Sequence, residues 1–593
     1  MAPFHLAREL NERILKYGDR TAMRYRHDGH WRELSWTDLG RQIRMAAQGL
    51  LALGVREGER VGIFSSNRPE WTIADCAIFS LRAVSVPFYA TSTAKQVQYI
   101  VDEAEIGAIF VGGQEPYDTL CNLAPSAKAK RIIVFDDGVD LRGGADAVRF
   151  RDFLESGRSA GGDEELDQRL AAASPEDLAT LIYTSGTTGE PKGVILHHRT
   201  FQHCFEGHVK RLEVSDRDVS LCFLPLSHIF ERAWTHFALN QGMVVAYCDD
   251  TARIVECLQE VRPTIMCAVP RFYEKIYATI FEKLEGATAS KRRLFHWAIG
   301  TGWQVFLLRN GRRPIPPLLK FRHRIAEALV LKKLRGIVGG RIRFFPCAGA
   351  PLSQKIEEFF HAAGIPIAYG YGLTETCATV TCHESFHARP GTVGKPIPGV
   401  EVRIAQDDEI LVRGETVTKG YYRKPEATAE AFTADGWFRT GDAGVLDDGY
   451  LTITDRIKDL MKTSGGKYIA PQLIETLIGN DYYVEQVSVI GDQRQYVTAL
   501  IVPSFTALEE YARKKGIPFA SCEELIRHPE VIRLYEERIR ENTLDLAPYE
   551  MVRKFTLLPR PFTQEAGEMT PTMKLKRKVI NQHYGDLIET MYR

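Results

Sequence analysis

Two apolar patterns alternate along residues 36–111. Apolar positions spaced like one face of a helix alternate with short apolar runs that are typical of buried strands. The predicted helices are 38–53 with Asp38 at its cap, a segment that opens at Pro69, and 93–104; the predicted strands are 61–64, 83–87 and 108–111. This alternation predicts a parallel sheet covered by helices on both faces, which a further strand at 131–135 extends.

The texture of the chain changes twice after this region. A polar stretch at 155–176 predicts a surface excursion, after which helix and strand patterns resume through Tyr369. From Glu401 onward, short strands are separated by Asp-Gly turns at 435–436 and 448–449. The charged segment 454–459 precedes an α+β tail. We therefore expect an N-terminal domain at 1–454, a hinge at 455–460 and a C-terminal domain at 461–593.

Composition narrows the classes of protein. The 593 residues exceed the size at which one hydrophobic core stops growing, about 250–300 residues. With 44% hydrophobic and 26% charged residues, the chain is globular rather than disordered or fibrous. The 76 basic residues balance 76 acidic ones, so no overall charge attracts nucleic acid. Eleven cysteines without a Cys-x-x-Cys pair argue against a disulfide framework or a zinc ribbon.

Targeting segments are not expected. The first residues mix acids, bases and apolar side chains, unlike a secretory signal. Charges such as Arg82 interrupt the apolar runs, so none is long enough to cross a bilayer. We expect a soluble chain in the reducing cytoplasm, with attachment to a membrane surface left open.

A loop dense in phosphate-binding groups follows the apolar residues 181–183. Glycine lets successive backbone N–H groups converge on an anion, hydroxyls add donors, and lysine adds a positive charge. The residues that carry these groups are Thr184, Ser185, Gly186, Thr187, Thr188, Gly189 and Lys192. We interpret the loop as a triphosphate site; the alternative is a Thr- and Gly-rich hairpin turn without a ligand.

The loop is not a Walker A motif, which needs GxxxxGK[ST] running into a helix. Here Lys192 follows Pro191, and residues 193–196 have the character of a strand. The expected context is therefore strand–loop–strand.

Three further motifs follow in order. They are Tyr371-Gly372-Leu373-Thr374-Glu375-Thr376, Gly436-Trp437-Phe438-Arg439-Thr440-Gly441-Asp442 and Asp455-Arg456-Ile457-Lys458-Asp459. Together with the loop they resemble, over nearly the whole chain, the adenylate-forming superfamily of acyl-CoA synthetases, peptide-synthetase adenylation domains and luciferases. The resemblance implies two steps: a carboxylate and ATP give an acyl-adenylate and pyrophosphate, and a thiol then displaces AMP. Such chemistry depends on positioning and charge neutralisation.

The resemblance also implies roles for the motif residues around the phosphates and the base. Glu375 coordinates Mg²⁺, a hard cation that prefers oxygen ligands, and Thr374 and Thr184 add hydroxyl contacts. Tyr371 stacks on adenine opposite the turn Gly349-Ala350-Pro351. A tyrosine of the core is the alternative reading of Tyr371.

Asp442 resembles the aspartate that binds both ribose hydroxyls, since one carboxylate can accept two hydrogen bonds from a vicinal diol. Arg456 resembles a ligand of ribose or phosphate, and its alternative is a solvent-exposed arginine. Lys458 occupies the hinge position, where a few torsions rotate the small domain.

Two C-terminal segments resemble parts of the family that act in the thioester step and in the adenylation step. Gly465, Gly466 and Lys467 match the segment that approaches the pantetheine of coenzyme A. Residues 569–577 resemble the end of long-chain fatty acyl-CoA synthetases and make Lys574 the catalytic lysine. Met573 replaces the glycine that often precedes this lysine, so Lys576 remains an alternative register, as does a merely basic tail.

Residues 224–232 and 269–277 resemble the acyl-binding part of the long-chain branch. His228 is expected to gate or orient the carboxylate, with Trp234 beside it; a satisfied core histidine is the alternative. The longest departure from a minimal enzyme is 291–343, which carries fourteen Lys and Arg residues and one acid, Glu327. Aromatic residues interleave with these cations, which suits an anionic membrane surface. A solvated helical hairpin whose bases pair with acids elsewhere is the alternative.

Two catalytic strings are rejected. His383-Glu384-Ser385-Phe386-His387 spells the zinc-peptidase motif, but Arg389-Pro390-Gly391 follows at once, so we expect a loop or strand end instead of the helix that zinc binding needs. Residues 157–161 spell G-x-S-x-G, but no apolar strand leads into them.

The sequence therefore predicts an α/β protein with a large N-terminal domain of stacked α/β subdomains plus a β-rich subdomain, and a small α+β C-terminal domain. We expect an ATP-, Mg²⁺- and coenzyme A-dependent ligase of medium-to-long-chain fatty acids, cytoplasmic or peripheral on the inner face of the membrane. The alternatives are a fatty acyl-AMP ligase that serves a carrier protein and a non-catalytic membrane-binding homologue.

Overall fold

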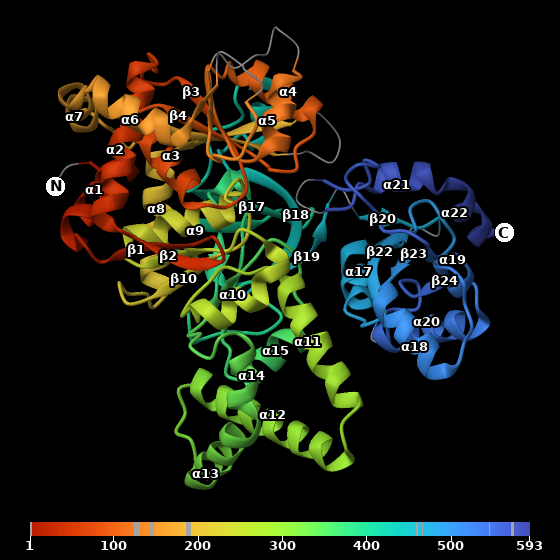
Figure 1. Cartoon of the computed structure of the whole chain (residues 1–593). Coiled ribbons are helices and arrows are strands. Elements are labelled where there is room, and N and C mark those ends of the chain that lie inside the picture. The colour runs from red at the N-terminus through yellow and green to blue at the C-terminus, as the bar shows by residue number, and fades with distance from the viewer. Residues whose placement is uncertain are drawn as a thin grey trace.

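The structure is a computed structural model, and it describes residues 3–123, 131–141, 147–184, 191–457, 460–464, 467–544, 546–570 and 574–593. A large body of helices and sheets contains the N-terminal three quarters of the chain (Figure 1). A smaller C-terminal domain lies beside it, and a group of helices projects from the body on another side (Figure 1).

A seven-stranded sheet in the order β7-β6-β5-β3-β4-β8-β9 forms the first subdomain. All neighbouring strands are parallel except the antiparallel pair β8 and β9, so the predicted parallel sheet is confirmed. The strands are β3 (Arg60–Phe64), β4 (Val84–Phe88), β5 (Ala108–Val111), β6 (Arg131–Val134), β7 (Ala147–Arg149), β8 (Leu178–Thr184) and β9 (Lys192–His197).

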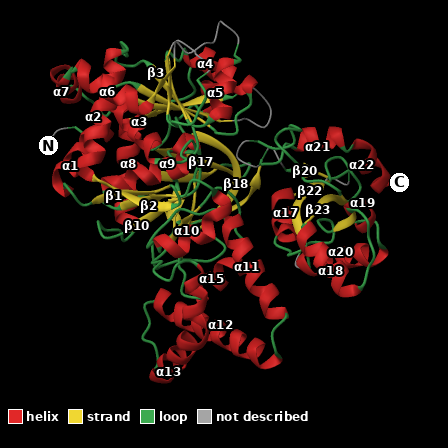
Figure 2. Cartoon of the chain, viewed as in Figure 1, coloured by secondary structure: helices red, strands yellow, loops and turns green. Residues whose placement is uncertain are grey.

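Helices cover both faces of this sheet, which Figure 2 shows in red around yellow strands. Buried side chains of the first three helices and α6 share one core with Val61 and Ile63. Side chains of α4 and α5 share the opposite core with Phe64 and Val86. The helices of this part are α1 (Leu6–Tyr17), α2 (Trp36–Ala52), α3 (Pro69–Ser80), α4 (Ala94–Ala104), α5 (Gln114–Cys121), α6 (Phe150–Ala160), α7 (Asp163–Ala171), α8 (His198–Arg211) and α9 (Ile229–Asn240).

One local prediction in this region was wrong. Ser35, not Asp38, caps α2: the Ser35 hydroxyl accepts a 3.0 Å hydrogen bond from the backbone N–H of Asp38, which lies in the first turn. The polar stretch 155–176 is mostly exposed, as predicted for a surface segment, and α6 and α7 occupy most of it. Gly157 of α6 meets Gly49 of α2, where an added Cβ would lie 2.5 Å from the Gly49 nitrogen. The same helix carries Ser159, which confirms that the G-x-S-x-G string forms no nucleophile elbow.

A second and a third sheet form the rest of the α/β body. The second runs in the order β10-β11-β1-β2 and the third in the order β12-β13-β14-β15. Their strands are β1 (Thr21–His27), β2 (His30–Ser35), β10 (Val219–Cys222), β11 (Val244–Tyr247), β12 (Phe345–Cys347), β13 (Ile367–Tyr371), β14 (Thr381–Cys382) and β15 (Lys395–Pro396).

The helices of the central part include those of the projection. They are α10 (Ile254–Val261), α11 (Pro270–Glu285), α12 (Ala289–Asn310), α13 (Pro317–Ala326), α14 (Lys332–Ile337), α15 (Gln354–Ala362) and α16 (Pro425–Ala431), with short turns at Thr251–Arg253, Glu327–Leu331 and Thr374–Thr376.

An antiparallel four-stranded sheet, β16-β17-β18-β19, follows as the predicted β-rich part. It comprises β16 (Val400–Ile404), β17 (Glu409–Gly414), β18 (Phe438–Asp447) and β19 (Tyr450–Arg456). Asp448 and Gly449 both have positive φ angles, 50° and 75°, in the predicted tight turn between β18 and β19. Strand β19 continues through Asp455 and Arg456, so the sheet reaches into the residues expected as the hinge.

The C-terminal domain has its own hydrophobic cores and a three-stranded sheet, β22-β23-β24. Its strands are β20 (Met461–Lys462), β21 (Tyr468–Ile469), β22 (Val484–Ile490), β23 (Val497–Pro503) and β24 (Val552–Leu557). Its helices are α17 (Pro471–Gly479), α18 (Phe505–Lys515), α19 (Cys522–Leu525), α20 (Pro529–Asn542), α21 (Arg577–His583) and α22 (Gly585–Tyr592). In the described ranges, no helix of either domain has the length and apolar character needed to cross a bilayer.

Candidate active site

The base of the expected phosphate loop is a β-hairpin. Thr184 at the end of β8 pairs with Lys192 at the start of β9 in an antiparallel register. The predicted strand–loop–strand context is therefore confirmed at both ends of the loop. Ser185, Gly186, Thr187, Thr188 and Gly189 lie outside the described residues.

Tyr421 connects Lys192 with Glu375. The Nζ atom of Lys192 lies 5.0 Å from the ring centroid of Tyr421, within the range of a cation–π contact. The hydroxyl of Tyr421 donates a 2.9 Å hydrogen bond to Oε1 of Glu375. Two motifs that are distant in sequence thus meet at one aromatic ring.

Glu375 lies in the short 3₁₀ turn Thr374–Thr376 directly after β13. Its backbone carbonyl accepts a 2.7 Å hydrogen bond from Thr418, which fixes the turn against the segment before Tyr421. Burial raises the pKa of the Glu375 carboxyl above its ordinary value, and the charge of Asp442 adds to the effect. Thr374 is buried in the same turn. The carboxylate therefore stands where a nearby cation would stabilise its charged form.

Tyr371, Asp442 and Arg456 form a second group. The hydroxyl of Tyr371 donates a 2.6 Å hydrogen bond to Oδ2 of Asp442. Nε of Arg456 lies 3.3 Å from Oδ1 of the same carboxylate, and the two residues are direct cross-strand partners in β18 and β19. Burial, and then the charge of Asp442, raise the pKa of Tyr371 well above its ordinary value. Arg456 is half-buried rather than solvent-exposed.

The turn Gly349-Ala350-Pro351 follows β12 and is exposed. Gly349 has a φ of +96°, a conformation that favours glycine. The Tyr369 hydroxyl donates a 2.9 Å hydrogen bond to the Ala350 carbonyl and accepts one of 2.9 Å from the Leu352 N–H. These two hydrogen bonds fix the exposed turn beside β13, which carries Tyr369.

His228 of the large domain and Lys574 of the C-terminal domain lie near each other. Nδ1 of His228 accepts a 3.2 Å hydrogen bond from the Phe230 N–H and caps α9. Burial, with the nearby positive charge of Lys574, lowers the pKa of His228 to about 4. The imidazole is therefore neutral at pH 7. The Lys574 backbone is held by Thr570, whose N–H donates to the Lys574 carbonyl and whose hydroxyl accepts from the Lys574 N–H.

A second contact between the domains lies at α11. Nη2 of Arg271 donates hydrogen bonds of 3.0 Å and 3.2 Å to the carbonyl and Oε1 of Glu485 in β22. Lys467 lies on the C-terminal domain, exposed, with its Nζ atom 5.9 Å from the Tyr549 ring. Lys458, Gly465 and Gly466 fall outside the described residues, so their expected roles stay predictions.

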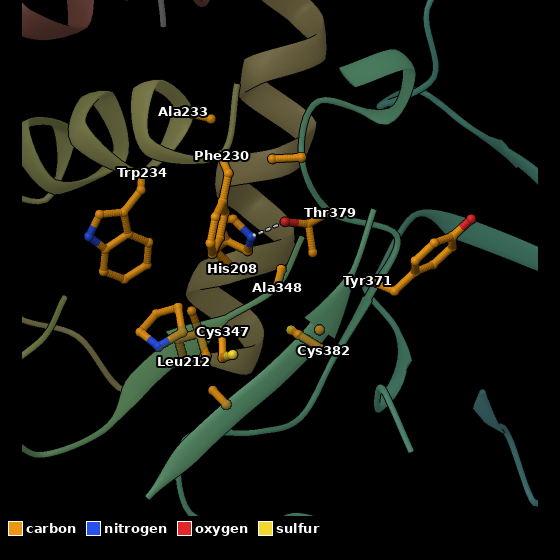
Figure 3. Close-up of a pocket in the computed structure, with 14 residues that line it drawn as sticks. His208, Leu212, Phe230, Ala233, Trp234, Cys347, Ala348, Tyr371, Thr379 and Cys382 are labelled. Atoms are coloured by element: carbon orange, nitrogen blue, oxygen red, sulfur yellow. Dashed lines mark hydrogen bonds between the residues drawn. The ribbon is translucent and has the colours of Figure 1, made fainter. Parts of the chain in front are cut away.

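A narrow, mostly apolar cavity of about 30 Å³ opens beside Tyr371. Figure 3 shows Tyr371 on one side of it and Trp234 on the other, and its dashed line marks the 3.0 Å contact between Nε2 of His208 and the Thr379 hydroxyl. The lining residues come from α8, α9, β12, β13 and the segment after the Glu375 turn: His208, Leu212, Phe230, Ala233, Trp234, Pro346, Cys347, Ala348, Ala368, Gly370, Tyr371, Ala378, Thr379 and Cys382. A cavity of this size has room for a few atoms, and its mostly apolar lining suits methylene groups better than polar ones.

Buried polar contacts fix the segment that carries His228. The Asn67 side chain donates to the Leu224 carbonyl at 2.7 Å and accepts from the Leu226 N–H at 2.9 Å. Oε2 of the fully buried Glu231 accepts a 3.2 Å hydrogen bond from the Leu224 N–H. Burial raises the pKa of Glu231 to about 8. These two residues orient the loop that ends at His228.

The rejected zinc string forms no helix. Thr381–Cys382 is a short strand, and Glu384 and His387 form an isolated antiparallel bridge after it. His383 contacts Thr392 at 3.0 Å within this loop. Among the described residues, no group of three or more His, Cys, Asp or Glu side chains is placed to hold a metal ion. The expectation that these residues lie in a loop or at a strand end, and not on a helix, is confirmed.

Three parts of the site were missed from the sequence. Tyr421 lies in a Gly-Tyr-Tyr run outside the sequence motifs, and only its hydrogen bond to Glu375 shows that it belongs to the site. Asn67 and Glu231 act on a loop that is more than a hundred residues from Asn67 in the chain. His208 follows an ordinary helical pattern, and nothing in that pattern distinguishes a cavity wall from a core.

Comparisons with protein families agree with this geometry. Residues 10–422 match a family described as AMP-binding enzyme, and residues 458–593 match the AMP-binding enzyme C-terminal domain. The chain is 38% identical over 573 residues to the long-chain-fatty-acid–CoA ligase FadD15 of Mycobacterium bovis, which covers 95% of this chain and 93% of that protein. It is 33% identical to the peroxisomal long chain acyl-CoA synthetase 7 of Arabidopsis thaliana, over 96% of this chain and 83% of that protein.

Solved structures show the same fold. The adenylation domain of a carboxylate reductase from Mycobacterium chelonae aligns with a TM-score of 0.76 at 23% identity, over 99% of this chain and 91% of that one. A Mycobacterium tuberculosis fatty acyl CoA synthetase aligns with a TM-score of 0.61 at 22% identity, over 98% of this chain and 99% of that one.

Proposed function

Because the chain belongs to the AMP-binding enzyme family, we propose that it converts a medium-to-long-chain fatty acid, ATP and coenzyme A into acyl-CoA, AMP and pyrophosphate. The observation that carries this proposal is the convergence of Lys192, Glu375 and Asp442 from three separate motifs. A carboxylate becomes a good acyl donor once AMP is attached as a leaving group, and these residues are of the kinds that hold the nucleotide while this happens.

The two groups of side chains divide the nucleotide between them. Lys192 and the phosphate loop, residues Thr184 to Gly189, neutralise and hold the triphosphate. Asp442 accepts the ribose hydroxyls, and Arg456, whose Nε lies 3.3 Å from Oδ1, forms an ion pair with its carboxylate. Tyr371 and the turn Gly349-Ala350-Pro351 border the adenine. The hydrogen bond from Tyr371 to Asp442 links the base and ribose sites.

The site fits a magnesium ion carried on the phosphates. Glu375 forms no ion pair with any described Lys, Arg or His, although its carboxylate is half-buried. An unpaired carboxylate in such surroundings favours a cation, and Mg²⁺ needs only one or two protein oxygens when phosphates and water supply the rest. Glu375 would hold the ion, with Thr184 and Thr374 as hydroxyl neighbours. Its role would be to neutralise charge on the phosphates.

Lys574 supplies the charge for the reacting carboxylate. Its ammonium lies near the neutral His228, at the boundary between the two domains. In this position it neutralises both the fatty acid carboxylate and the α-phosphate as they approach each other. His228 orients the carboxylate through Nε2, since its Nδ1 accepts from Phe230. Trp234, whose Nε1 donates to Ser220 at 2.9 Å, forms a wall of the acyl cavity.

The thioester step uses the other domain. After adenylate formation, rotation about Lys458 brings the segment with Gly465, Gly466 and Lys467 to the pantetheine thiol. The domain assignment 1–454, 455–460 and 461–593 belongs to this proposal.

We also place the enzyme in the cytoplasm, peripheral on the inner face of the membrane. Fatty acids of this length partition into bilayers, and the segment 291–343 is strongly basic. Nucleic acid is not a partner in this proposal.

The test is a panel of acids of increasing length, with ATP, Mg²⁺ and coenzyme A, read out as AMP release and acyl-CoA formation. The proposal expects both products with palmitate. Adenylate without thioester would indicate instead a fatty acyl-AMP ligase that serves a carrier protein. If no acid in the panel releases pyrophosphate, the proposal is wrong and a non-catalytic homologue is the better explanation.

A further inference from the structure

A group of helices at 289–337 projects from the large domain, and α13 lies at its far end (Figure 1). The projection consists of α12, α13, the π-helical turn Glu327–Leu331 and α14. Helix α12 packs through Ala298 against Ala326 and Leu331, so the helices form a small apolar core of their own. Side chains of α13 that do not enter this core are presented outward.

Exposed apolar side chains gather on α13 and the turn that follows it. Leu318, Phe321 and Ile325 on α13 are 71%, 61% and 38% exposed, and Leu329 in the π-helical turn Glu327–Leu331 is 46% exposed. The spacing of three and four residues places the three α13 side chains on one face of the helix, as an apolar stripe. Single exposed apolar residues are ordinary, but a set of large ones so close together marks an interaction surface.

Unpaired cations surround this stripe. Of the fourteen Lys and Arg residues in 291–343, two form an ion pair with a described carboxylate: Arg335 with Glu327 and Arg343 with Asp218. The alternative of a hairpin whose bases pair with acids elsewhere is therefore not what the described residues show. Four of the remaining cations are exposed on this projection: Lys320 and Arg324 on α13, and Lys332 and Lys333 at the start of α14.

The combination of a helical apolar stripe and unpaired cations selects one kind of partner. A second copy of the same face would bring like charges together, which disfavours a symmetric dimer. Nucleic acid would use the cations but would leave the apolar stripe in water. An anionic bilayer uses both, because acyl chains accept the apolar side chains and phosphates accept the cations. Long Lys and Arg side chains can also reach outward to the headgroups from such a position.

We propose that α13, with the turn after it, is the membrane-docking element of this protein, lying in the headgroup region of an anionic phospholipid bilayer with Leu318, Phe321 and Ile325 inserted and Leu329 beside them. This inference rests on the proposed peripheral attachment and is independent of the assignments in the nucleotide site. The projection keeps the lipid contact away from the C-terminal domain, which lies on another side of the body (Figure 1).

The first test is co-sedimentation with vesicles of pure phosphatidylcholine and of phosphatidylcholine with an equal part of phosphatidylglycerol. We expect binding to the anionic vesicles, and at least tenfold weaker binding to the neutral ones or in high salt. The double variant Leu318→Ser, Phe321→Ser should lose at least tenfold in affinity, since both side chains are mostly exposed and neither supports the fold. Leu15→Ser is the matched control, because Leu15 is 85% exposed on α1.

Charge is tested in the same way. Lys320→Gln with Arg324→Gln should weaken binding to anionic vesicles several-fold, whereas removing two exposed lysines elsewhere, Lys355→Gln with Lys514→Gln, should not. Insertion is tested with brominated lipids: Phe321→Trp should add quenchable fluorescence, and Leu15→Trp should not.

The outcomes separate this inference from the proposed activity. Acyl-CoA formation from octanoate, a water-soluble acid, should be equal in the native protein and in all these variants. Equal vesicle binding by the native chain and the double variant would overturn the role of α13. The same conclusion would follow if the native chain bound no vesicles, or formed a dimer that Phe321→Ser dissociates. Vesicle binding by a chain that lacks ligase activity would overturn only the catalytic proposal.

Discussion

The hydroxyl of Tyr371 donates a 2.6 Å hydrogen bond to Oδ2 of Asp442, which joins two motifs separated by 71 residues. The bond ties the end of β13 to β18, whose neighbour β19 contributes Arg456 to the other carboxylate oxygen. The proposed base and ribose sites are therefore connected, and replacing either Tyr371 or Asp442 should weaken binding of both the base and the ribose.

Replacing Asp442 with Asn tests this unit. The variant keeps the shape of the side chain but removes the charge that Arg456 and the ribose hydroxyls use. Charge-assisted hydrogen bonds contribute roughly 1.5–3 kcal/mol, so we expect the KM for ATP to rise roughly 10- to 100-fold. Steady-state kinetics at varied ATP concentrations measure this KM. Tyr371→Phe is the companion variant, with a smaller increase; an unchanged KM for ATP in Asp442→Asn would contradict the ribose assignment.

Replacing Glu375 with Gln tests the magnesium site. The Gln side chain can still accept from Tyr421 but has no charge, so the Mg²⁺ concentration for half-maximal activity should rise about tenfold or more. Burial raises the pKa of Glu375, so the native enzyme should lose activity on acidification at a higher pH than an ordinary glutamate would cause. Tyr421→Phe is the control that removes the hydrogen bond and keeps the charge. If Glu375→Gln has the Mg²⁺ dependence of the native enzyme, the ion is held elsewhere.

Lys574→Ala should separate the two half-reactions. Loss of a positive group aimed at developing charge typically costs about 10²- to 10³-fold, and we expect this loss in adenylate formation, measured by pyrophosphate exchange. Thioester formation from supplied acyl-adenylate should change little. Lys576→Ala is the matched control two residues further on, in the alternative register. Equal losses in both half-reactions, or a larger loss in Lys576→Ala, would show that Lys574 has been assigned wrongly.

The apolar cavity predicts a change in chain-length preference. Ala233 and Ala238 are both buried on α9, but only Ala233 lines the cavity. Ala233→Val should raise the KM for a sixteen-carbon acid about tenfold relative to an eight-carbon acid, since a methylene in an apolar pocket is worth roughly 1–3 kcal/mol. Ala238→Val adds the same volume outside the cavity and should leave the ratio unchanged. Identical ratios in the two variants would argue against this route for the acyl chain.

Glu231 should make the stability of the large domain depend on pH. Burial raises its pKa from 4.5 to about 8, so between these values the folded chain holds a proton that the unfolded chain has lost. The free energy of unfolding should therefore fall as pH rises through this window, by at most about 1.4 kcal/mol per pH unit from this group. Glu231→Gln removes this contribution.

Urea unfolding at pH 5 to 8, followed by tryptophan fluorescence, measures this free energy of unfolding. All seven Trp residues precede residue 455, so the fluorescence reports on the large domain alone. Parallel pH profiles for native and variant chains would mean that Glu231 is ionised in the folded state.

Most of the first sheet could be predicted because its signals are local. Thr93 forms a capping box with Gln96 at the expected start of α4, and Pro69 opens α3 as its first residue. The helices α6 and α7 could not be predicted in this way, because their polar faces dominate the composition. The close approach of Gly157 to α2 rests on the absence of a side chain, which leaves no apolar signal.

The residues of the candidate site also differ in whether local sequence signals identify them. Lys192, Glu375 and Asp442 stand in motifs that can be read from neighbouring residues, so the sequence identifies them. Tyr421 and Asn67 act through contacts with residues far away in the chain, and only the folded chain shows these contacts. The exposed stripe of α13 could be predicted only in part. The basic character of 291–343 is visible in the sequence, but which apolar residues face outward depends on the packing of α12.

The pair formed by Arg271 and Glu485 has a consequence for turnover. Both side chains are partly exposed, 40% and 47%, and an ion pair of this kind contributes about 0–1 kcal/mol. Thermal energy is about 0.6 kcal/mol, so this ion pair by itself opens and recloses readily. In the proposed two-step reaction the pair would therefore favour one arrangement of the C-terminal domain without trapping it there, and binding or release of a substrate would shift the balance.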